Sequence, residues 1–206
     1  QSAQTALCGS NLRQTGQLQQ LYSSDNDSWT TPCLKGYASS PLSGAAWGQQ
    51  LIDEGYTSAV QGQPSILVCP TGDTPVGKGV WTNGGGHTYG LRVGWSFGPW
   101  RVADRVTHVA IGGYHYGSPS EFLYILDSLV DNSGLPYQHR RQWYAFYVNA
   151  TTTLRVHRRH NRRANGLYGD GHIASFNRQE LIGQSPGHHM TVPGVLRYGF
   201  EDCSSE

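Results

Sequence analysis

The first two dozen residues constrain the fold most, because their pattern predicts one long amphipathic helix. From Ser2 to about Ser24, apolar side chains recur on one broad side of a helix: Ala3, Leu7, Cys8, Leu12, Leu18, Leu21 and Tyr22. Gly16 interrupts this pattern at a cost of about 1 kcal/mol relative to Ala, so packing must hold the helix together. Residues 23–28 (SSDNDS) are capping and turn formers, which predicts that the helix ends there.

The remainder of the chain predicts short strands. Runs of strand length, either apolar, aromatic or alternating, occupy residues 65–69, 122–127, 143–148 and 171–176. In the last run the alternation places His172, Ala174 and Phe176 on one face, and Asn165-Gly166 before it predicts a turn. One N-terminal helix followed by late antiparallel strands predicts an α+β fold.

Two segments lie between the long helix and these late strands. Residues 47–56 (WGQQLIDEGY) predict a short helix that Gly55 ends. Residues 71–100 are rich in glycine and tryptophan but have almost no periodic pattern. We interpret them as a long loop or irregular hairpin pinned by aromatic side chains, and such loops often carry function.

Length and charge limit the organisation and the partners. A chain of 206 residues and 22.6 kDa is enough for one domain with a real core and short for two, so we expect a single domain over residues 1–206. The net charge of +1 excludes a chain whose overall field captures nucleic acid or anionic lipid, so any such binding would be local. No stretch approaches the roughly 20 apolar residues that a membrane helix needs.

The four cysteines are spread along the chain without a Cys-x-x-Cys pair, which disfavours zinc ribbons and thioredoxin-like motifs. The number of cysteines is even, and the chain has two lysines against thirteen arginines and a single methionine. This composition fits an exported protein with two disulfides. The alternative is buried free thiols. We expect the pairs Cys8–Cys69 and Cys33–Cys203, since the first would tie the long helix to the first predicted strand.

Three features, in this order along the chain, carry a resemblance to a known family. The first is CGSNLRQTG at residues 8–16 in the predicted helix, followed by YSSDND at residues 22–27. The second is Cys69-Pro70 after a predicted strand. The third is the string HNRRANGLYGDGH, with His160, Asn165, Asp170, Gly171 and His172 as its motif residues. Together they resemble the prepilin-type proteins with an H-X9-DG domain, which are pilin-like or pseudopilin-like proteins of the bacterial surface.

The resemblance covers roughly residues 3–80 and 118–182, and it is weak over the middle of the chain. It implies a pilin-like α+β fold, with an N-terminal α-helix packed on a small antiparallel β-sheet. Residues 1–24 would be the polar half of that helix, residues 70–117 a large loop-rich insertion, and residues 118–182 the sheet with the H-X9-DG hairpin.

The family also implies a function and a location. It implies a non-enzymatic subunit of a bacterial surface filament or secretion pseudopilus, with adhesion as a further role. Its partners would be other pilin-like subunits and the secretion or pilus machinery, at the cell surface or outside the cell. Pilin-like proteins begin with an apolar helix half that anchors them in the inner membrane before assembly. We expect that half to precede Gln1, unless a naturally processed form lacks it.

The motif residues themselves favour a structural role. Asp170-Gly171 between β-prone segments can set the register of a hairpin, and His160 would hydrogen-bond across that turn, to Asp170 for example. The alternative is a metal or acid–base site made of His160, Asp170 and His172, but no pair at helical spacing such as H-E-x-x-H supports it. We therefore expect no metal and no cofactor.

A second function class competes with the pilin-like one. Residues 138–163 contain seven arginines and no acid, interleaved with aromatic residues that can stack on bases or sugars. The alternative is therefore a secreted binding module for carbohydrate or DNA, although a solvated basic face that meets a neighbouring subunit explains the same pattern. The candidate contact residues are Arg155, Arg158, Arg159, Arg162, Arg163, Trp81, Trp95 and Trp100, with Trp47 as a further carbohydrate contact.

The sequence disfavours an enzyme. It has no G-x-S-x-G motif, no paired carboxylate motif and no phosphate-binding loop, since its glycine-rich stretches lack the required lysine or strand-to-helix context. A metal-dependent hydrolase that uses some of the nine histidines is the remaining enzymatic alternative.

Overall fold

The computed structural model describes residues 2–33, 46–93, 120, 122–130, 141–147, 154–177, 179–180 and 200–202. These residues form an α+β fold, which confirms the predicted fold class. The helices are α1 (Ser2–Asp25) and α2 (Trp47–Asp53). The strands are β1 (Asp73–Thr74), β2 (Gly77–Lys78), β3 (Gly90–Val93), β4 (Leu123–Leu126), β5 (Ser128–Val130), β6 (Ala145–Tyr147), β7 (Leu154–Arg158), β8 (Ala164–Tyr168), β9 (Ile173–Phe176) and β10 (Phe200–Asp202).

The largest sheet in the described part of the chain is mixed rather than antiparallel. Its order is β6-β3-β4-β8-β9, and β3 pairs with β6 in parallel while the other neighbours are antiparallel. A second sheet has the order β10-β7-β5, again with one parallel pair, and β1 and β2 form a separate hairpin. The predicted antiparallel sheet is therefore confirmed for β3, β4, β8 and β9, whereas the parallel β3–β6 pair departs from it. Parallel neighbours need long connections, and β3 and β6 are separated by residues 94–144.

Of the predicted insertion at residues 70–117, residues 94–117 lie outside the described residues. The remainder contains the β1–β2 hairpin, as expected for an irregular segment. It also contains β3, an inner strand of the largest sheet, so this part belongs to the core of the fold.

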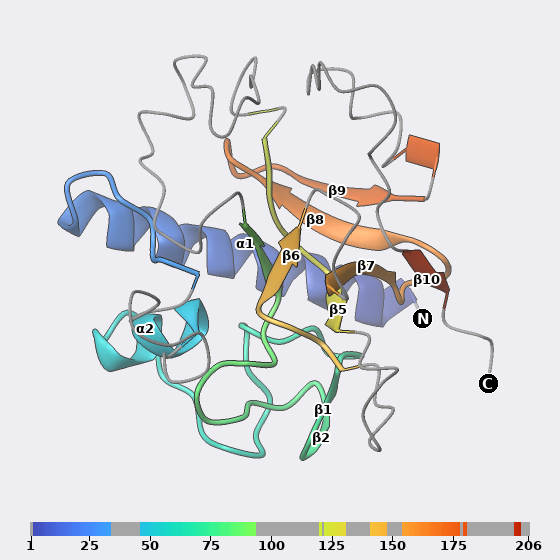
Figure 1. Ribbon diagram of the computed structural model, residues 1–206, viewed down its shortest axis with the longest axis horizontal. Helices are drawn as coiled ribbons and strands as arrows, with labels where there is room; N and C mark the ends of the chain where they lie inside the picture. Colours follow the sequence, from blue (N-terminus) through green and yellow to red (C-terminus); the bar gives the residue numbers. More distant parts are fainter. Residues whose placement is uncertain are drawn as a thin grey trace.

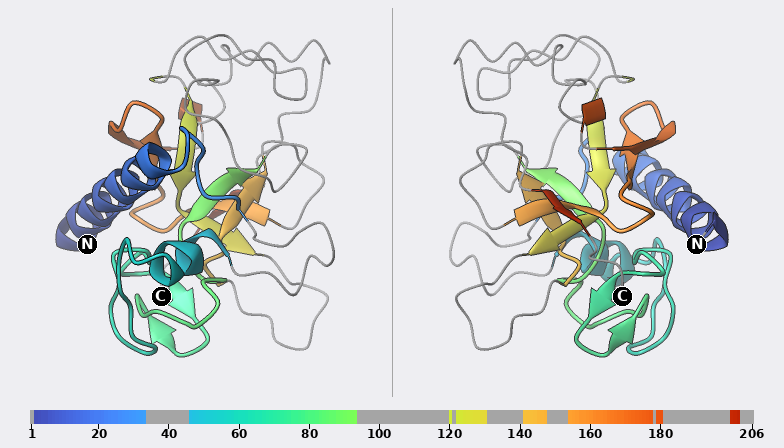
Figure 2. Two further views of the ribbon diagram at one scale, coloured as in Figure 1. Left: turned by 90° about the vertical axis from the view of Figure 1, so that its left-hand side faces the viewer. Right: turned by 90° about the vertical axis from the view of Figure 1, so that its right-hand side faces the viewer.

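Helix α1 spans the molecule beside β8 and β9 (Figure 1). Both side views place it along one side of the molecule, with α2 and the β1–β2 hairpin below it (Figure 2). The helix lies close to the sheet at Gly16, where a Cβ atom would be only 2.7 Å from Leu167 Cδ2 on β8. The glycine that weakens the isolated helix therefore lets it lie close to the sheet.

The buried face of α1 is half polar. Cys8, Leu12 and Tyr22 are buried, but Asn11, Thr15, Gln19 and Ser23 are buried with them. Leu7 and Leu21 are 51% and 56% exposed, so the broad apolar side predicted from the sequence is wrong for these two leucines. The polar side chains that are buried instead find hydrogen-bond partners on neighbouring loops and on β4.

These polar side chains of α1 hydrogen-bond to a loop at residues 65–69. Residues 65–69 were predicted to form a strand, but they form turns. Thr15 Oγ1 donates to the Ile66 carbonyl at 3.0 Å, and Asn11 Nδ2 donates to the Val68 carbonyl at 3.2 Å. Because helix side chains satisfy these buried carbonyls, the apolar run at Leu67 can be buried without a β-ladder.

The predicted turn at Asn165-Gly166 was also wrong, because both residues lie inside β8. Gly166 pairs with both β4 and β9, and a Cβ atom there would lie 2.6 Å from Leu123 Cδ1. The turn lies earlier, at Asn161 and Arg162, which both have positive φ angles of 51° and 61°. His160 and Arg163 exchange two backbone hydrogen bonds of 3.0 Å across it. This is the pattern of a two-residue hairpin turn.

Other predicted elements are confirmed. Helix α1 ends at Asp25, directly before a turn in which Asp27 and Ser28 have positive φ. Helix α2 begins at Trp47 as predicted, and Gly55 (φ 83°) follows its end. The predicted strands at residues 122–127, 143–148 and 171–176 correspond to β4, β6 and β9. No helix in the described part of the chain combines the length and apolar content that a membrane crossing requires.

The same substitution at two positions of α1 tests this packing. Leu12 is fully buried, so Leu12→Ala is expected to lower the free energy of unfolding by about 2–5 kcal/mol. Leu21 is more than half exposed, so Leu21→Ala should change it by no more than about 0.5 kcal/mol. Urea denaturation of both variants measures the difference. Equal losses would contradict the orientation of α1.

Candidate functional site

Four buried side chains that are far apart in the sequence meet in the interior. Cys8 lies on α1 and Cys69 on the loop before β1. Asp127 directly follows β4, and His160 lies at the start of the turn between β7 and β8. One ligand-type atom of each lies within 4.8 Å of the corresponding atoms of the other three. We call these four residues the interior cluster.

Asp127 lies where the two sheets meet, because its backbone is hydrogen-bonded to a strand of each. Its backbone N–H donates to the Asn165 carbonyl at 3.0 Å, on β8 of the larger sheet. Its carbonyl accepts from the His157 N–H at 3.0 Å, on β7 of the smaller sheet. The side chain therefore sits where the two sheets meet, and it is fully buried.

Short contacts connect the four side chains. His160 Nε2 lies 3.3 Å from both Cys69 Sγ and Asp127 Oδ2. Cys8 Sγ donates to Asp127 Oδ1 at 3.7 Å. The Asn165 backbone N–H donates to Asp127 Oδ2 at 2.9 Å, which fixes the carboxylate.

A basic side chain and several hydrogen bonds surround the interior cluster. Arg159 Nε lies 3.8 Å from Asp127 Oδ1, and Arg159 Nη2 donates to the Ser128 carbonyl at 2.6 Å. The Tyr89 hydroxyl donates to Cys8 Sγ at 3.4 Å, and Thr71 Oγ1 lies 3.3 Å from Cys69 Sγ.

Although the interior cluster is buried, hydrogen bonds and neighbouring charges favour the charged forms of His160, Cys69 and Asp127. Burial lowers the pKa of His160, but hydrogen bonds to Asp127 and Cys69 outweigh it and raise the pKa to about 10. Burial raises the pKa of Cys69, but hydrogen bonds from Cys8 and His160, together with the Arg159 charge, lower it to about 6. Burial likewise opposes ionisation of Asp127, yet His160 and Arg159 keep its carboxyl pKa below the usual value.

Cys8 behaves oppositely to Cys69. Burial, followed by its contacts with Cys69 and Asp127, raises the pKa of the Cys8 thiol well above its usual value. These directions favour a Cys69 thiolate, a His160 imidazolium and an ionised Asp127 beside a neutral Cys8 thiol. With Arg159 the buried charges sum to zero, which is the condition for burying them.

The structure divides the H-X9-DG motif into a buried part and an exposed part. His160 and Asn165 are buried, and both contact the network that holds α1: Asn165 Nδ2 donates to the Thr5 carbonyl at 3.4 Å. The partners of the His160 side chain are Cys69 and Asp127 instead of the expected Asp170.

The exposed part forms the β8–β9 hairpin turn, as predicted. Gly171 has a φ of 90°, and its N–H donates to the Tyr168 carbonyl at 3.0 Å. Asp170 Oδ1 accepts from the His172 backbone N–H at 3.0 Å and lies 2.6 Å from His172 Nδ1. Slight burial opposes ionisation, but these contacts outweigh it and lower the carboxyl pKa of Asp170. The alternative metal site of His160, Asp170 and His172 is therefore not assembled.

The predicted disulfides are only partly covered by the described residues. Cys8 and Cys69 are brought together, with their sulfur atoms at most 4.8 Å apart, but both are free thiols in this structure. Cys33 is also a buried free thiol, and Cys203 lies outside the described residues. The pairings Cys8–Cys69 and Cys33–Cys203 stay predictions.

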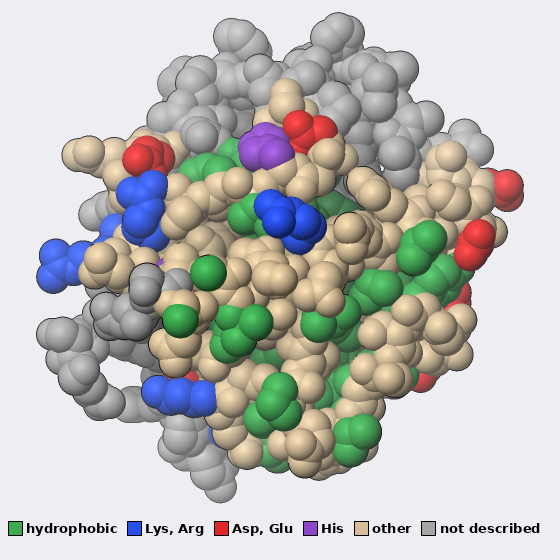
Figure 3. Space-filling view, turned by 180° about the vertical axis from the view of Figure 1, so that it is seen from behind, with side chains coloured by type: hydrophobic (Ala, Val, Ile, Leu, Met, Phe, Trp, Pro, Cys, Tyr) green, Lys and Arg blue, Asp and Glu red, His purple; other side chains and the backbone are tan. Residues whose placement is uncertain are grey.

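Of the candidate contact residues that the structure describes, Trp47, Trp81 and Arg159 are buried. Trp47 and Trp81 are almost fully buried, with the Trp47 indole N–H donating to the Tyr144 carbonyl at 3.0 Å, so neither ring is available to a polymer. Arg159 is buried at the interior cluster, whereas Arg162 is exposed and Arg163 bonds Glu180 at 2.7 Å. Trp95 and Trp100 lie outside the described residues. On the face shown in Figure 3, Lys and Arg side chains stand in several separate places.

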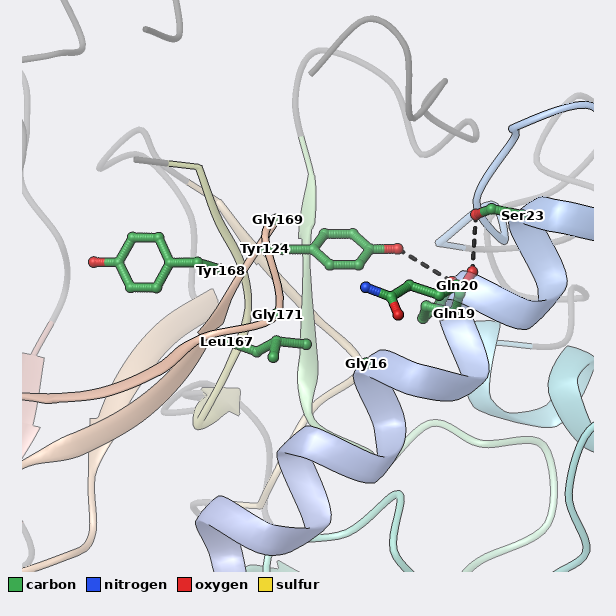
Figure 4. Close-up of a pocket in the computed structure, with 9 residues that line it drawn as sticks. All are labelled: Gly16, Gln19, Gln20, Ser23, Tyr124, Leu167, Tyr168, Gly169 and Gly171. Carbon is green, nitrogen blue, oxygen red and sulfur yellow. Dashed lines mark hydrogen bonds between the residues drawn. The ribbon is translucent and has the colours of Figure 1, made fainter. Parts of the chain in front are cut away.

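A depression of about 60 Å³ lies between α1 and the β8–β9 turn. Figure 4 shows Tyr124 pointing towards α1, where its hydroxyl donates to Gln19 Oε1 at 3.1 Å, while Tyr168 points away. A second depression of about 370 Å³ lies near His87. Neither is lined by a residue of the interior cluster.

The burial limits what the interior cluster can do. A thiolate next to a histidine resembles an activated nucleophile, but Cys69 is 0% exposed and a substrate has no access to its sulfur. Asp127 also contacts the same imidazole nitrogen as Cys69, whereas an orienting carboxylate contacts the other one. The arrangement therefore suits a structural role or the binding of an ion.

Comparison with known proteins yields no match: no family model, no curated protein and no solved structure is significantly similar to this chain. The resemblance to the H-X9-DG proteins thus rests on the motif residues, and it stays a prediction.

Sequence reasoning missed Asp127 and the inward role of Arg159. The signal was present, because a single acid directly follows the buried run FLYIL, where a charged side chain needs a partner. The identity of that partner could not be read from the sequence, since Cys8 and Asp127 are 119 positions apart.

Paired carboxylate variants test the two parts of the motif region. Asp127→Asn is expected to lower the free energy of unfolding by about 3–5 kcal/mol, because it leaves one buried positive charge of the Arg159–His160 pair uncompensated. Asp170→Asn, in the exposed turn, should cost about 0.5 kcal/mol. Chemical denaturation at neutral pH compares them. If Asp127→Asn costs no more than Asp170→Asn, the Asp127 carboxylate does not have this central role.

Proposed function

We propose that this protein is a non-enzymatic, pilin-like subunit of a bacterial surface filament or secretion pseudopilus. The observation that carries the proposal is the attachment of α1. The family-like residues Asn11, His160 and Asn165 all belong to the contacts that fasten this helix and its neighbouring loop to the sheets. A subunit that assembles through its N-terminal helix needs such a rigid connection between helix and globular part.

The free side of α1 supports the same proposal. The helix has 24 residues, and its outward side carries Leu7 and Leu21, both more than half exposed. Exposed leucines on a helix suit contacts with neighbouring subunits. The burial of Cys69 supports the non-enzymatic part. An adhesive role towards polysaccharide or DNA would depend on Trp95, Trp100 and the exposed Arg162, and it is proposed only as an addition.

A first experiment concerns the native protein. Material sheared from the surface of the source cells should contain this chain in large assemblies, preceded by an apolar segment of about 20 residues. Intact mass and N-terminal sequencing establish this. A monomeric native protein that starts at Gln1 would refute assembly through an N-terminal helix and favour the secreted binding module.

Two glutamate substitutions test the helix surface. Leu7→Glu should remove most of the protein from sheared filaments, because the charge would face a neighbouring subunit. Val60→Glu is the matched control, since Val60 is 66% exposed and lies outside α1. Both variants should keep the thermal stability of the parent, because both side chains are exposed. Equal assembly of the two variants would count against α1 as the contact surface.

A further inference from the structure

The geometry points to a structural zinc site in the interior cluster, with Cys8, Cys69, His160 and Asp127 as its four ligands. This inference concerns a bound divalent cation and does not depend on the proposed function.

The spacing of the ligand atoms fits a tetrahedral ion. Zinc lies about 2.3 Å from cysteine sulfur and about 2.0–2.2 Å from histidine nitrogen or carboxylate oxygen, so tetrahedral ligand atoms lie about 3.3–3.8 Å apart. Three of the six separations between ligand atoms lie in this range, and all six are within 4.8 Å. Cys69 Sγ to His160 Nε2 and His160 Nε2 to Asp127 Oδ2 are 3.3 Å, and Cys8 Sγ to the same Oδ2 is 3.8 Å.

The ligand types select zinc among the common cations. Two cysteine sulfurs and one imidazole exclude a site for calcium or magnesium, which take oxygen ligands. Four protein ligands, all buried, leave no open position for water or substrate, which is the arrangement of a structural site.

The surroundings hold each ligand in place. Tyr89 donates to Cys8 Sγ, Thr71 Oγ1 lies next to Cys69 Sγ, and the Asn165 N–H fixes Asp127 Oδ2. Such outer contacts orient ligands and tune the ion. Asp127 Oδ1, in contrast, has Cys8 Sγ at 3.7 Å and Arg159 Nε at 3.8 Å, both longer than an ordinary hydrogen bond of about 2.7–3.2 Å. Asp127 would therefore bind the cation through Oδ2, while Oδ1 stays beside Arg159.

The charges also balance. A Zn²⁺ ion with two thiolates and one carboxylate carries one negative charge, which the neighbouring Arg159 guanidinium compensates. Binding would fasten together α1, the loop at Cys69 and the junction of the two sheets. Because all four ligands are buried, the ion would enter as the chain folds.

Metal analysis of the whole chain is the direct test. The protein, refolded with reductant and Zn²⁺ and then dialysed, should retain one zinc per chain by elemental mass spectrometry. Co²⁺ in place of zinc should give intense sulfur-to-cobalt charge-transfer absorption, which requires bound thiolates. A wild-type protein that retains no stoichiometric zinc, or lacks this absorption, would overturn the proposal without any variant having to fold.

Matched variants locate the site. Cys69→Ser should lose the zinc, whereas Cys33→Ser should keep it, because Cys33 is equally buried but is not part of the interior cluster. Tyr89→Phe, which removes only an outer contact, should weaken zinc binding about 10–100-fold in a chelator competition. Loss of zinc in Cys33→Ser would exclude the interior cluster as the specific site.

The Cys8–Cys69 disulfide is the competing outcome. Protein isolated from its source without reductant should take up alkyl groups on Cys8 and Cys69 only after a chelator has removed the metal. Peptides joined by a Cys8–Cys69 bridge in that material would overturn the zinc site and establish the bridge instead. This result would leave the proposed filament function untouched, because assembly is measured separately.

Discussion

The buried carboxylate of Asp127 is the constraint on which the rest of the described structure depends. A fully buried charge is tolerated only if it is paired and hydrogen-bonded, so Asp127 requires His160, Arg159 and the Asn165 N–H around it. Its backbone at the same time connects the two sheets. The partners that the Asp127 carboxylate requires therefore constrain the β7–β8 turn, the junction of the two sheets and the position of Cys8 on α1.

The attachment of α1 follows the same principle. A helix whose buried face contains Asn11, Thr15 and Gln19 gains less from apolar burial than an amphipathic helix with a fully apolar face. It gains specificity instead, since these amides and hydroxyls have correctly placed partners on the loop at residues 66–68, on Thr31 and on Tyr124. Gly16 completes the fit by allowing contact with Leu167. A connection of this kind resists sliding along the helix axis.

Local sequence patterns predicted where helices and turns occur better than they predicted which elements pack against one another. The ends of α1, the stop of α2 at Gly55 and the Asp170-Gly171 turn were correct, because capping and turn residues act on the backbone next to them. The errors at residues 65–69 and at Asn165-Gly166 have a common cause. In both places a distant element decides the conformation: helix side chains take the role of a β-ladder in the first, and two flanking strands enclose Gly166 in the second.

The sequence by itself determined an α+β chain with a long N-terminal helix, a hairpin at the end of the H-X9-DG string and the residue types of the motif. Periodicity and turn chemistry are local properties, so they can be read in order along the chain. Only the tertiary structure decided that His160 faces Asp127 and Cys69 rather than Asp170, and that Cys8 completes the group. These contacts join residues up to 119 positions apart, and their geometry exists only once the helix and both sheets have packed together.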